Sequence, residues 1–129
     1  MNRVIVAVGS NFNPVENIAK ARTFIQNKHP LVKVSRLRET RPVGDISLSN
    51  FLNGVFLIET EWNQHRLKSW LKELEVDLGR VSGKTPSGFL PIDLDIVVWN
   101  GDVVDPDVYE RDFLREAVLE VWPDLKLQK

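Results

Sequence analysis

The chain alternates between short runs typical of β-strands and longer stretches with helical periodicity, and this order most constrains its fold. Four runs rich in β-branched, aromatic or alternating apolar residues predict strands at 3–8, 31–37, 51–59 and 92–99. Apolar residues recur at helical spacing within 15–25, 67–78 and 109–121. The order predicts an α+β fold, a ferredoxin-like βαββαβ two-layer sandwich with an additional C-terminal helix.

Particular residues refine these elements. Gly54, inside the third strand, predicts a bulge or a close approach by another group, for which a ligand is one candidate. The stripe from Leu67 to Leu78 is the clearest helical signal, with Asn63 as its expected cap and Gly79 as its expected end. Asn100-Gly101 predicts a turn after the last long strand.

Length and composition narrow the classes of function. A chain of 129 residues suits one domain, so we expect a single domain over 1–129 with one site. A formal charge of -1 gives no basic face for nucleic acid. The absence of cysteine excludes thiolate chemistry, while a hard cation on oxygen ligands remains possible. The apolar start is too short for a signal-peptide core and nothing later could span a membrane, so we expect a cytoplasmic protein.

Asp93 and Asp95 are the sharpest chemical signal. Strand alternation places both carboxylates on one face, about 6.6 Å apart, while Leu94 faces the core. Taken alone, such a pair is more often a solvated strand face. An irregular loop and Arg80 precede the strand, however, and this context favours a magnesium site for metal-assisted phosphoryl transfer. Lys84 stands in a stretch that looks like a P-loop, but the first glycine is missing and a helix precedes it.

A second group of residues could bind a flat heteroaromatic ligand. Thr40, Pro42 and Gly44 lie in an irregular loop, and Phe51 and Asn53 begin the next strand. Together they offer backbone groups, an aromatic face and a side-chain amide. In isolation, Phe51 is more often a core residue and Asn53 a capping or bulge residue.

Five segments, in order and register, make the chain resemble the 6-hydroxymethyl-7,8-dihydropterin pyrophosphokinases of folate biosynthesis. They are residues 8–11, 40–44, 50–53, 79–81 and 92–96. The resemblance implies transfer of the terminal two phosphates of ATP to the pterin hydroxymethyl group, and we expect a monomer with small-molecule substrates only.

The resemblance also assigns roles to residues. It implies a pterin pocket formed by Thr40, Pro42, Val43 and Asn53, with the ring stacked between Phe51 and Phe113. It implies that Asp93 and Asp95 hold two Mg²⁺ ions. Arg80 and Arg111 would neutralise developing charge, and Glu75 and Arg80 would contact the nucleotide, with Lys84 as a further phosphate contact.

The chain departs from the family mainly where the nucleotide is handled. Ser82, Ser87 and Leu90 stand where family members carry an arginine, an aromatic residue and another arginine. The segment 105–109 also lacks the family's histidine. Three hypotheses therefore remain open: an active pyrophosphokinase, a pterin-binding paralogue with weak or no activity, and a domain for another phosphorylated or heteroaromatic ligand.

Overall fold

The protein is described by a computed structural model that covers residues 1–41, 49–81 and 85–127. The strands are β1 (Asn2–Ser10), β2 (Leu31–Val34), β3 (Arg38–Thr40), β4 (Phe51–Thr60), β5 (Asp93–Trp99) and β6 (Asp102–Val103). The helices are α1 (Pro14–Lys28), α2 (Gln64–Val81), α3 (Asp107–Glu110) and α4 (Asp112–Val121). No helix within the described residues is long and apolar enough to cross a membrane.

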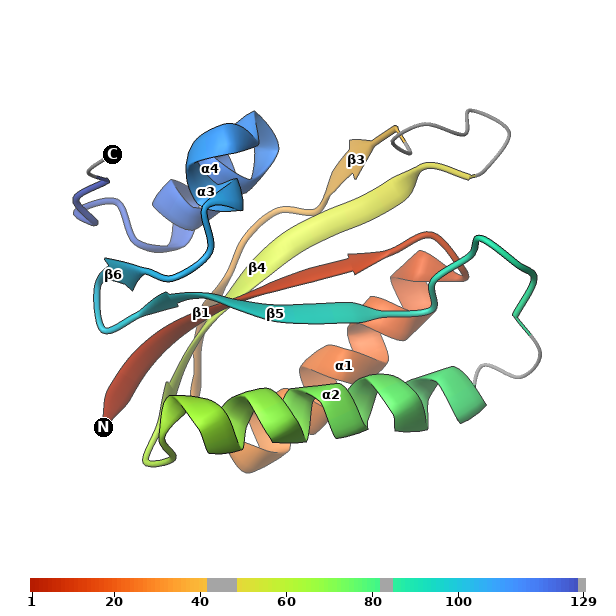
Figure 1. The fold of residues 1–129 in the computed structure, drawn as a ribbon, viewed down its shortest axis with the longest axis horizontal. Helices are drawn as coiled ribbons and strands as arrows, with labels where there is room; N and C mark the ends of the chain where they lie inside the picture. Colours follow the sequence, from red (N-terminus) through yellow and green to blue (C-terminus); the bar gives the residue numbers. More distant parts are fainter. Residues whose placement is uncertain (42–48, 82–84, 128–129) are drawn as a thin grey trace.

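The strands form one antiparallel sheet in the order β2-β4-β1-β5-β6, with β3 also paired to β4 (Figure 1). Helix α1 connects β1 to β2 across β4, and α2 connects β4 to β5 across β1. Two such interleaved crossovers are typical of the ferredoxin-like arrangement. The α+β fold predicted from the order of elements is therefore confirmed.

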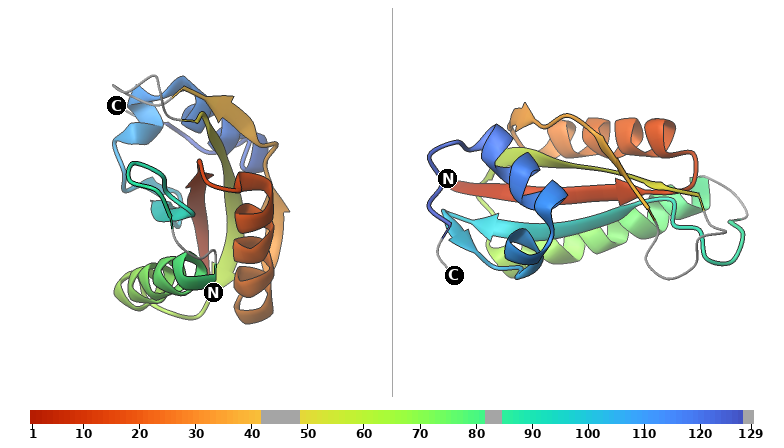
Figure 2. Two further views of the ribbon diagram at one scale, coloured as in Figure 1. Left: turned by 90° about the vertical axis from the view of Figure 1, so that its right-hand side faces the viewer. Right: turned by 90° about the horizontal axis from the view of Figure 1, so that it is seen from above.

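Both faces of the central strands are apolar, and helices cover both. On β1, Val4 and Val6 pack with α1 and α2, whereas Ile5 belongs to a second core cluster with α4. On β4, Phe56 belongs to the cluster with α1 and α2, and Leu57 belongs to the cluster with α4. Figure 2 shows α1 and α2 on one side of the sheet and the C-terminal helices on the other. The continuous apolar sequence of β1 follows from this burial on two faces.

Gly54 has a close neighbour within the chain. Between Val34, which pairs with Phe56, and Arg38, which pairs with Asn53, the outer strand has one residue more than β4. The resulting bulge presses Ser35 and its neighbours against Gly54, where a Cβ would lie 3.0 Å from Ser35 Oγ. The predicted close approach is confirmed, and the approaching group is the neighbouring segment of the same chain.

Element ends differ from the sequence expectations in three places. The strand expected at 31–37 ends at Val34 as β2, and Thr40, expected in an irregular loop, lies in the separate strand β3. Helix α2 has its expected cap, since Asn63 Oδ1 accepts the Arg66 N–H at 2.8 Å, but it runs through Gly79 to Val81. The C-terminal helix is not continuous, because Arg111 is extended (φ -115°, ψ 114°) and separates α3 from α4. The turn at Asn100-Gly101 is confirmed, with positive φ at both residues joining β5 to β6.

Candidate active site

A cavity of about 420 Å³ lies where β1, β3, β4 and β5 meet α4. This volume is within the range of small-molecule sites. The cavity brings together sequence-predicted residues that stand far apart in the chain: Thr40, Phe51, Asn53, Asp93, Asp95, Arg111 and Phe113. Pro42, Val43 and Lys84 were also predicted for the site, and they fall outside the described residues.

One end of the cavity, here called the aromatic end, is formed by Thr40, Phe51, Asn53 and Phe113. Asn53 Nδ2 donates to Thr40 Oγ1 at 2.7 Å, which fixes the amide between β3 and β4. Gly9 pairs with Asn53 across the sheet, and a Cβ on Gly9 would lie 2.9 Å from Asn53 Oδ1. Glycine there leaves room for the amide, which would have to shift if a Cβ were added.

The other end, here called the acidic end, carries Asp93 and Asp95. Alternation along β5 turns both into the cavity while Leu94 between them is fully buried, as the sequence predicted. Burial, followed by repulsion from Asp95 and a hydrogen bond with it, raises the pKa of Asp93 to about 7. Two carboxylates held this close favour either a shared proton or a cation.

Lys72 and Glu75 support the acidic end from α2. Glu75 Oε2 accepts the Leu94 N–H at 2.7 Å, and Lys72 Nζ lies 2.9 Å from the same oxygen. Lys72 Nζ also donates to Leu94 O at 2.9 Å and to Asp95 Oδ1 at 3.0 Å. Its pKa is raised, because these carboxylate contacts outweigh the opposing effect of burial. The network fixes α2 to the backbone between the two aspartates.

Lys72 was missed by the sequence reasoning, which used α2 only for its apolar stripe. The one available signal was its position three residues before Glu75, on the same helix face. Glu75 itself, expected to contact the nucleotide, is engaged by β5 and, though described, is not among the lining residues of the cavity.

The two arginines predicted for the site differ in their distance from the cavity. Arg111 lines the cavity beside Asp107, with Nε 3.4 Å from Asp107 Oδ2. Arg80 is also within the described part of the chain, but it is not a lining residue, and its side chain is 77% exposed and faces Asp77 at 3.7 Å. The structure therefore brings Arg111, but not Arg80, to the cavity.

Asn11 explains why the segment 8–11 matters to the site. Its Oδ1 accepts the Leu90 N–H at 2.6 Å, and its own N–H donates to Leu90 O at 3.1 Å. Ser10 Oγ also donates to Leu90 O at 3.3 Å. These bonds anchor the chain just before β5. The end of β1 therefore fixes the position at which β5 begins with Asp93.

The charge of the cavity bears on what it can bind. Its described lining residues include two guanidinium groups, Arg41 and Arg111, and four carboxylates, on Asp93, Asp95, Asp105 and Asp107. Such a surface repels a polyphosphate on balance, and accompanying cations would offset this repulsion. The described residues contain no group of three carboxylate or histidine ligands, but Mg²⁺ commonly takes one or two carboxylates and completes its shell with phosphate and water. Asp93 and Asp95 fit that requirement.

Comparison with known proteins decides the family. Residues 5–123 match the family model described as 7,8-dihydro-6-hydroxymethylpterin-pyrophosphokinase. The chain belongs to this family. The resemblance inferred from the five sequence segments is thereby confirmed.

Several relatives carry the corresponding names. The 2-amino-4-hydroxy-6-hydroxymethyldihydropteridine pyrophosphokinase of Haemophilus influenzae is 31% identical over 134 residues, covering 95% of this chain and 82% of the relative. That of Bacillus subtilis is 30% identical over 131 residues, covering 93% and 78%. The mitochondrial folate synthesis bifunctional protein of Pisum sativum is 30% identical over 128 residues, and the match spans 25% of its length. The chain is thus similar both to separate pyrophosphokinases and to one part of larger folate proteins.

Proposed function

We propose that the protein transfers pyrophosphate from ATP to 6-hydroxymethyl-7,8-dihydropterin in folate biosynthesis, as a single pyrophosphokinase domain over 1–129. The observation that carries this proposal is the single cavity in which a hydrogen-bonding aromatic end faces a pair of strand-borne carboxylates. In the reaction, the hydroxymethyl oxygen would lose its proton to solvent and form a bond to the β-phosphorus. The bond from that phosphorus to the oxygen shared with the α-phosphate would break, and AMP would leave with that oxygen.

The aromatic end would bind the pterin. Asn53 and Thr40 present an amide and a hydroxyl that are already hydrogen bonded to each other, so they are fixed before the ligand arrives. Phe51 on β4 and Phe113 on α4 line the same cavity and would stack on the two ring faces. Pro42 and Val43 would complete this pocket.

The acidic end would hold magnesium, with two ions expected when ATP is bound. Asp93 and Asp95 would be the protein ligands. The pKa of Asp93 is raised first by burial and then by repulsion from Asp95, and a cation would relieve that repulsion. Bound magnesium would supply positive charge to the phosphate oxygens and orient them. The contribution of the chain is a rigid strand, fixed by Glu75 and Lys72, on which both carboxylates point into the cavity.

The phosphates would be neutralised by Arg111 and by Arg80 together with Lys84. Arg111 lines the cavity and could reach the transferred group by exchanging Asp107 for phosphate. Arg80 is exposed at the end of α2, where its ion-pair partner among the described residues is the exposed Asp77, so it could turn towards the nucleotide together with Lys84. Glu75 would act on the nucleotide mainly by positioning β5. The monomeric state and the cytoplasmic location stay predictions.

Calorimetric titrations would test this proposal by measuring the binding of a separate ligand to each end of the cavity. We expect the purified protein to bind 6-hydroxymethyl-7,8-dihydropterin, and to bind a non-hydrolysable ATP analogue only when Mg²⁺ is present. Binding of the pterin without any binding of the Mg²⁺-analogue complex would instead identify a pterin-binding paralogue. Absence of pterin binding would overturn both readings and leave a domain for another ligand.

A further inference from the structure

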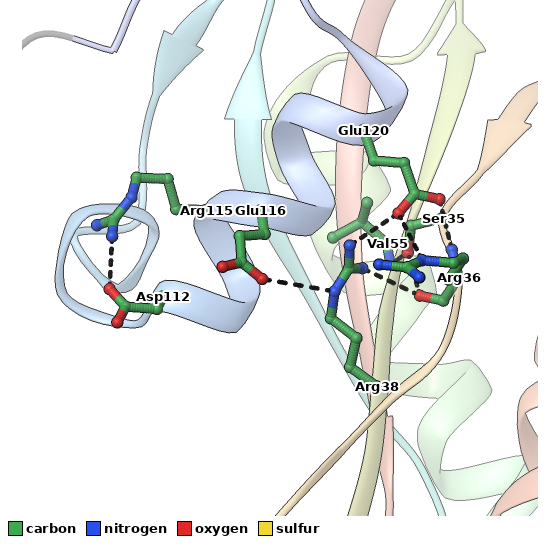
Figure 3. Close-up of polar contacts among 8 residues, drawn as sticks. All are labelled: Ser35, Arg36, Arg38, Val55, Asp112, Arg115, Glu116 and Glu120. Carbon is green, nitrogen blue, oxygen red and sulfur yellow. Dashed lines mark hydrogen bonds and ion pairs between the residues drawn. The ribbon is translucent and has the colours of Figure 1, made fainter.

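Outside the cavity, a polar cluster joins the last turn of α4 to the bulged outer strand (Figure 3). Glu120 is its centre. Its Oε2 accepts the Arg36 N–H at 2.7 Å, and its Oε1 accepts from Arg38 Nη2 at 2.8 Å. The Arg38 side chain is only 16% exposed and that of Glu120 28%, so water screens this pair less than it does a typical surface pair.

The negative charge of Glu120 lies at an unfavourable position in the helix unless groups of the outer strand stabilise it. A carboxylate in the last turn of a helix lies near the negative end of the helix dipole. Burial also opposes its charge, yet the pKa of Glu120 is lowered, because the Arg36 N–H and the Arg38 guanidinium stabilise the ionised form. The contact between strand and helix is therefore what keeps this charge in place.

The strand and the helix joined in this way form two walls of the cavity. Arg38 is two residues before Thr40 on β3, so both side chains lie on the same strand face. Glu120 is seven residues, or about two turns, after Phe113 on α4, and so the two share a helix face. Arg38 also pairs in register with Asn53, whose amide binds Thr40.

We propose that the Arg38–Glu120 ion pair positions the aromatic end of the cavity by setting the separation between Thr40 on β3 and Phe113 on α4. Neither partner is a lining residue among those described, so the pair would control pterin affinity without touching the ligand. The acidic end, built on β5 and α2, would be unaffected. This inference rests on the proposed function, because it takes the pterin as the ligand of the aromatic end.

The test compares Arg38→Met, which keeps the aliphatic stem, with Arg38→Lys, which keeps the charge. We expect Arg38→Met and Glu120→Gln each to weaken pterin binding about tenfold, since small misplacements of binding groups are costly. Arg38→Lys should retain most of the affinity. The double variant should be no weaker than either single variant, because both remove the same interaction. Binding of the Mg²⁺-ATP analogue should change less than twofold in all of them.

Two control variants separate positioning from general loss of an ion pair. Glu16→Gln removes the exposed pair with Lys20 on α1, 3.0 Å apart, and should leave both affinities unchanged. Glu116→Gln removes a longer contact of 3.9 Å to Arg38 and should have a smaller effect than Glu120→Gln. Thermal unfolding of each variant shows whether it is folded at the titration temperature.

Unchanged pterin affinity in folded Arg38→Met and Glu120→Gln would overturn the inference while leaving the proposed function intact. Equal weakening of pterin and nucleotide binding would also overturn it, because it would indicate a general structural role. Failure of the unaltered protein to bind pterin would overturn the proposed function and this inference together.

Discussion

The aromatic end and the acidic end of the cavity are built in opposite ways. At the aromatic end, Asn53 and Thr40 satisfy each other, and Gly9 makes room for the amide. At the acidic end, Asp93 and Asp95 repel each other, and Lys72 balances only part of their charge. The described polar groups of the first end are already paired before a ligand arrives, whereas a cation would relieve the repulsion at the second. Binding and chemistry should therefore respond separately to substitutions.

The largest expected effect comes from Asp95→Asn. It removes a carboxylate from the acidic end while preserving size and hydrogen-bonding capacity, so the loss of the metal site should lower turnover roughly a thousandfold. Pterin affinity, measured by calorimetry without Mg²⁺, should stay within about threefold of the original. A parallel loss of pterin affinity would contradict the separation of the two ends.

Gly9→Ala should have the reverse effect. The added Cβ would meet Asn53 Oδ1 at 2.9 Å and displace the amide, so pterin affinity should fall about tenfold, or ~1.4 kcal/mol. Gly79→Ala is the matched control, because no described residue beyond its helical neighbours lies within 4 Å of its Cβ position, and this helical site should gain up to about 1 kcal/mol in stability. If Gly9→Ala bound pterin normally, the preformed amide would not be the binding group.

Lys72→Met sharpens the comparison at the acidic end alone. Lys72 Nζ lies 3.0 Å from Asp95 Oδ1 and thus competes with a metal for that oxygen. Its removal should tighten binding of Mn²⁺, used as a probe in the absence of nucleotide, by about fivefold. The reason is that the positive charge of Lys72, which repels the positive metal ion, is removed. Pterin affinity should not change. Weaker Mn²⁺ binding would show that Lys72 chiefly holds β5 in place.

The smallest expected effect is a pH dependence of stability without metal. The pKa of Asp93 is raised from 3.8 to about 7 in the folded protein, so the folded state retains a proton that the unfolded chain has lost. The free energy of unfolding should therefore fall as pH rises between these values, by about 1 kcal/mol after allowance for solvent screening. In Asp93→Asn this component should be absent, and Mg²⁺ should reduce it in the unaltered protein. Denaturant titrations at pH 5 and pH 8 measure both.

Local periodicity in the sequence was sufficient to predict much of the fold. The β5 alternation correctly placed Asp93 and Asp95 on one strand face and Leu94 in the core, and the α2 stripe gave Leu67 and Leu71 as buried residues. The single extended residue Arg111 could not be predicted, because the apolar pattern continues through the break. Arg111 ends α3 by donating its N–H to Asp107 O, and it begins α4 by accepting the Leu114 and Arg115 N–H groups at its carbonyl.

Parts of the site that depend on long-range contacts were not visible in the sequence. Lys72 acts through Leu94 and Asp95 on a strand more than 20 residues away. Likewise, the Arg38–Glu120 pair spans 82 positions, and nothing local distinguishes either residue from an ordinary surface charge. Sequence motifs indicated the groups that would meet the ligand, whereas the groups that hold them in place were found only in three dimensions.

The most direct test of the central claim is the product balance after incubation with ATP, Mg²⁺ and 6-hydroxymethyl-7,8-dihydropterin, with the nucleotides and pterins separated by anion-exchange chromatography. The account predicts one AMP for each pterin diphosphate formed, with no product when either Mg²⁺ or the pterin is omitted. Pterin binding with AMP release no greater than in a protein-free blank would contradict it.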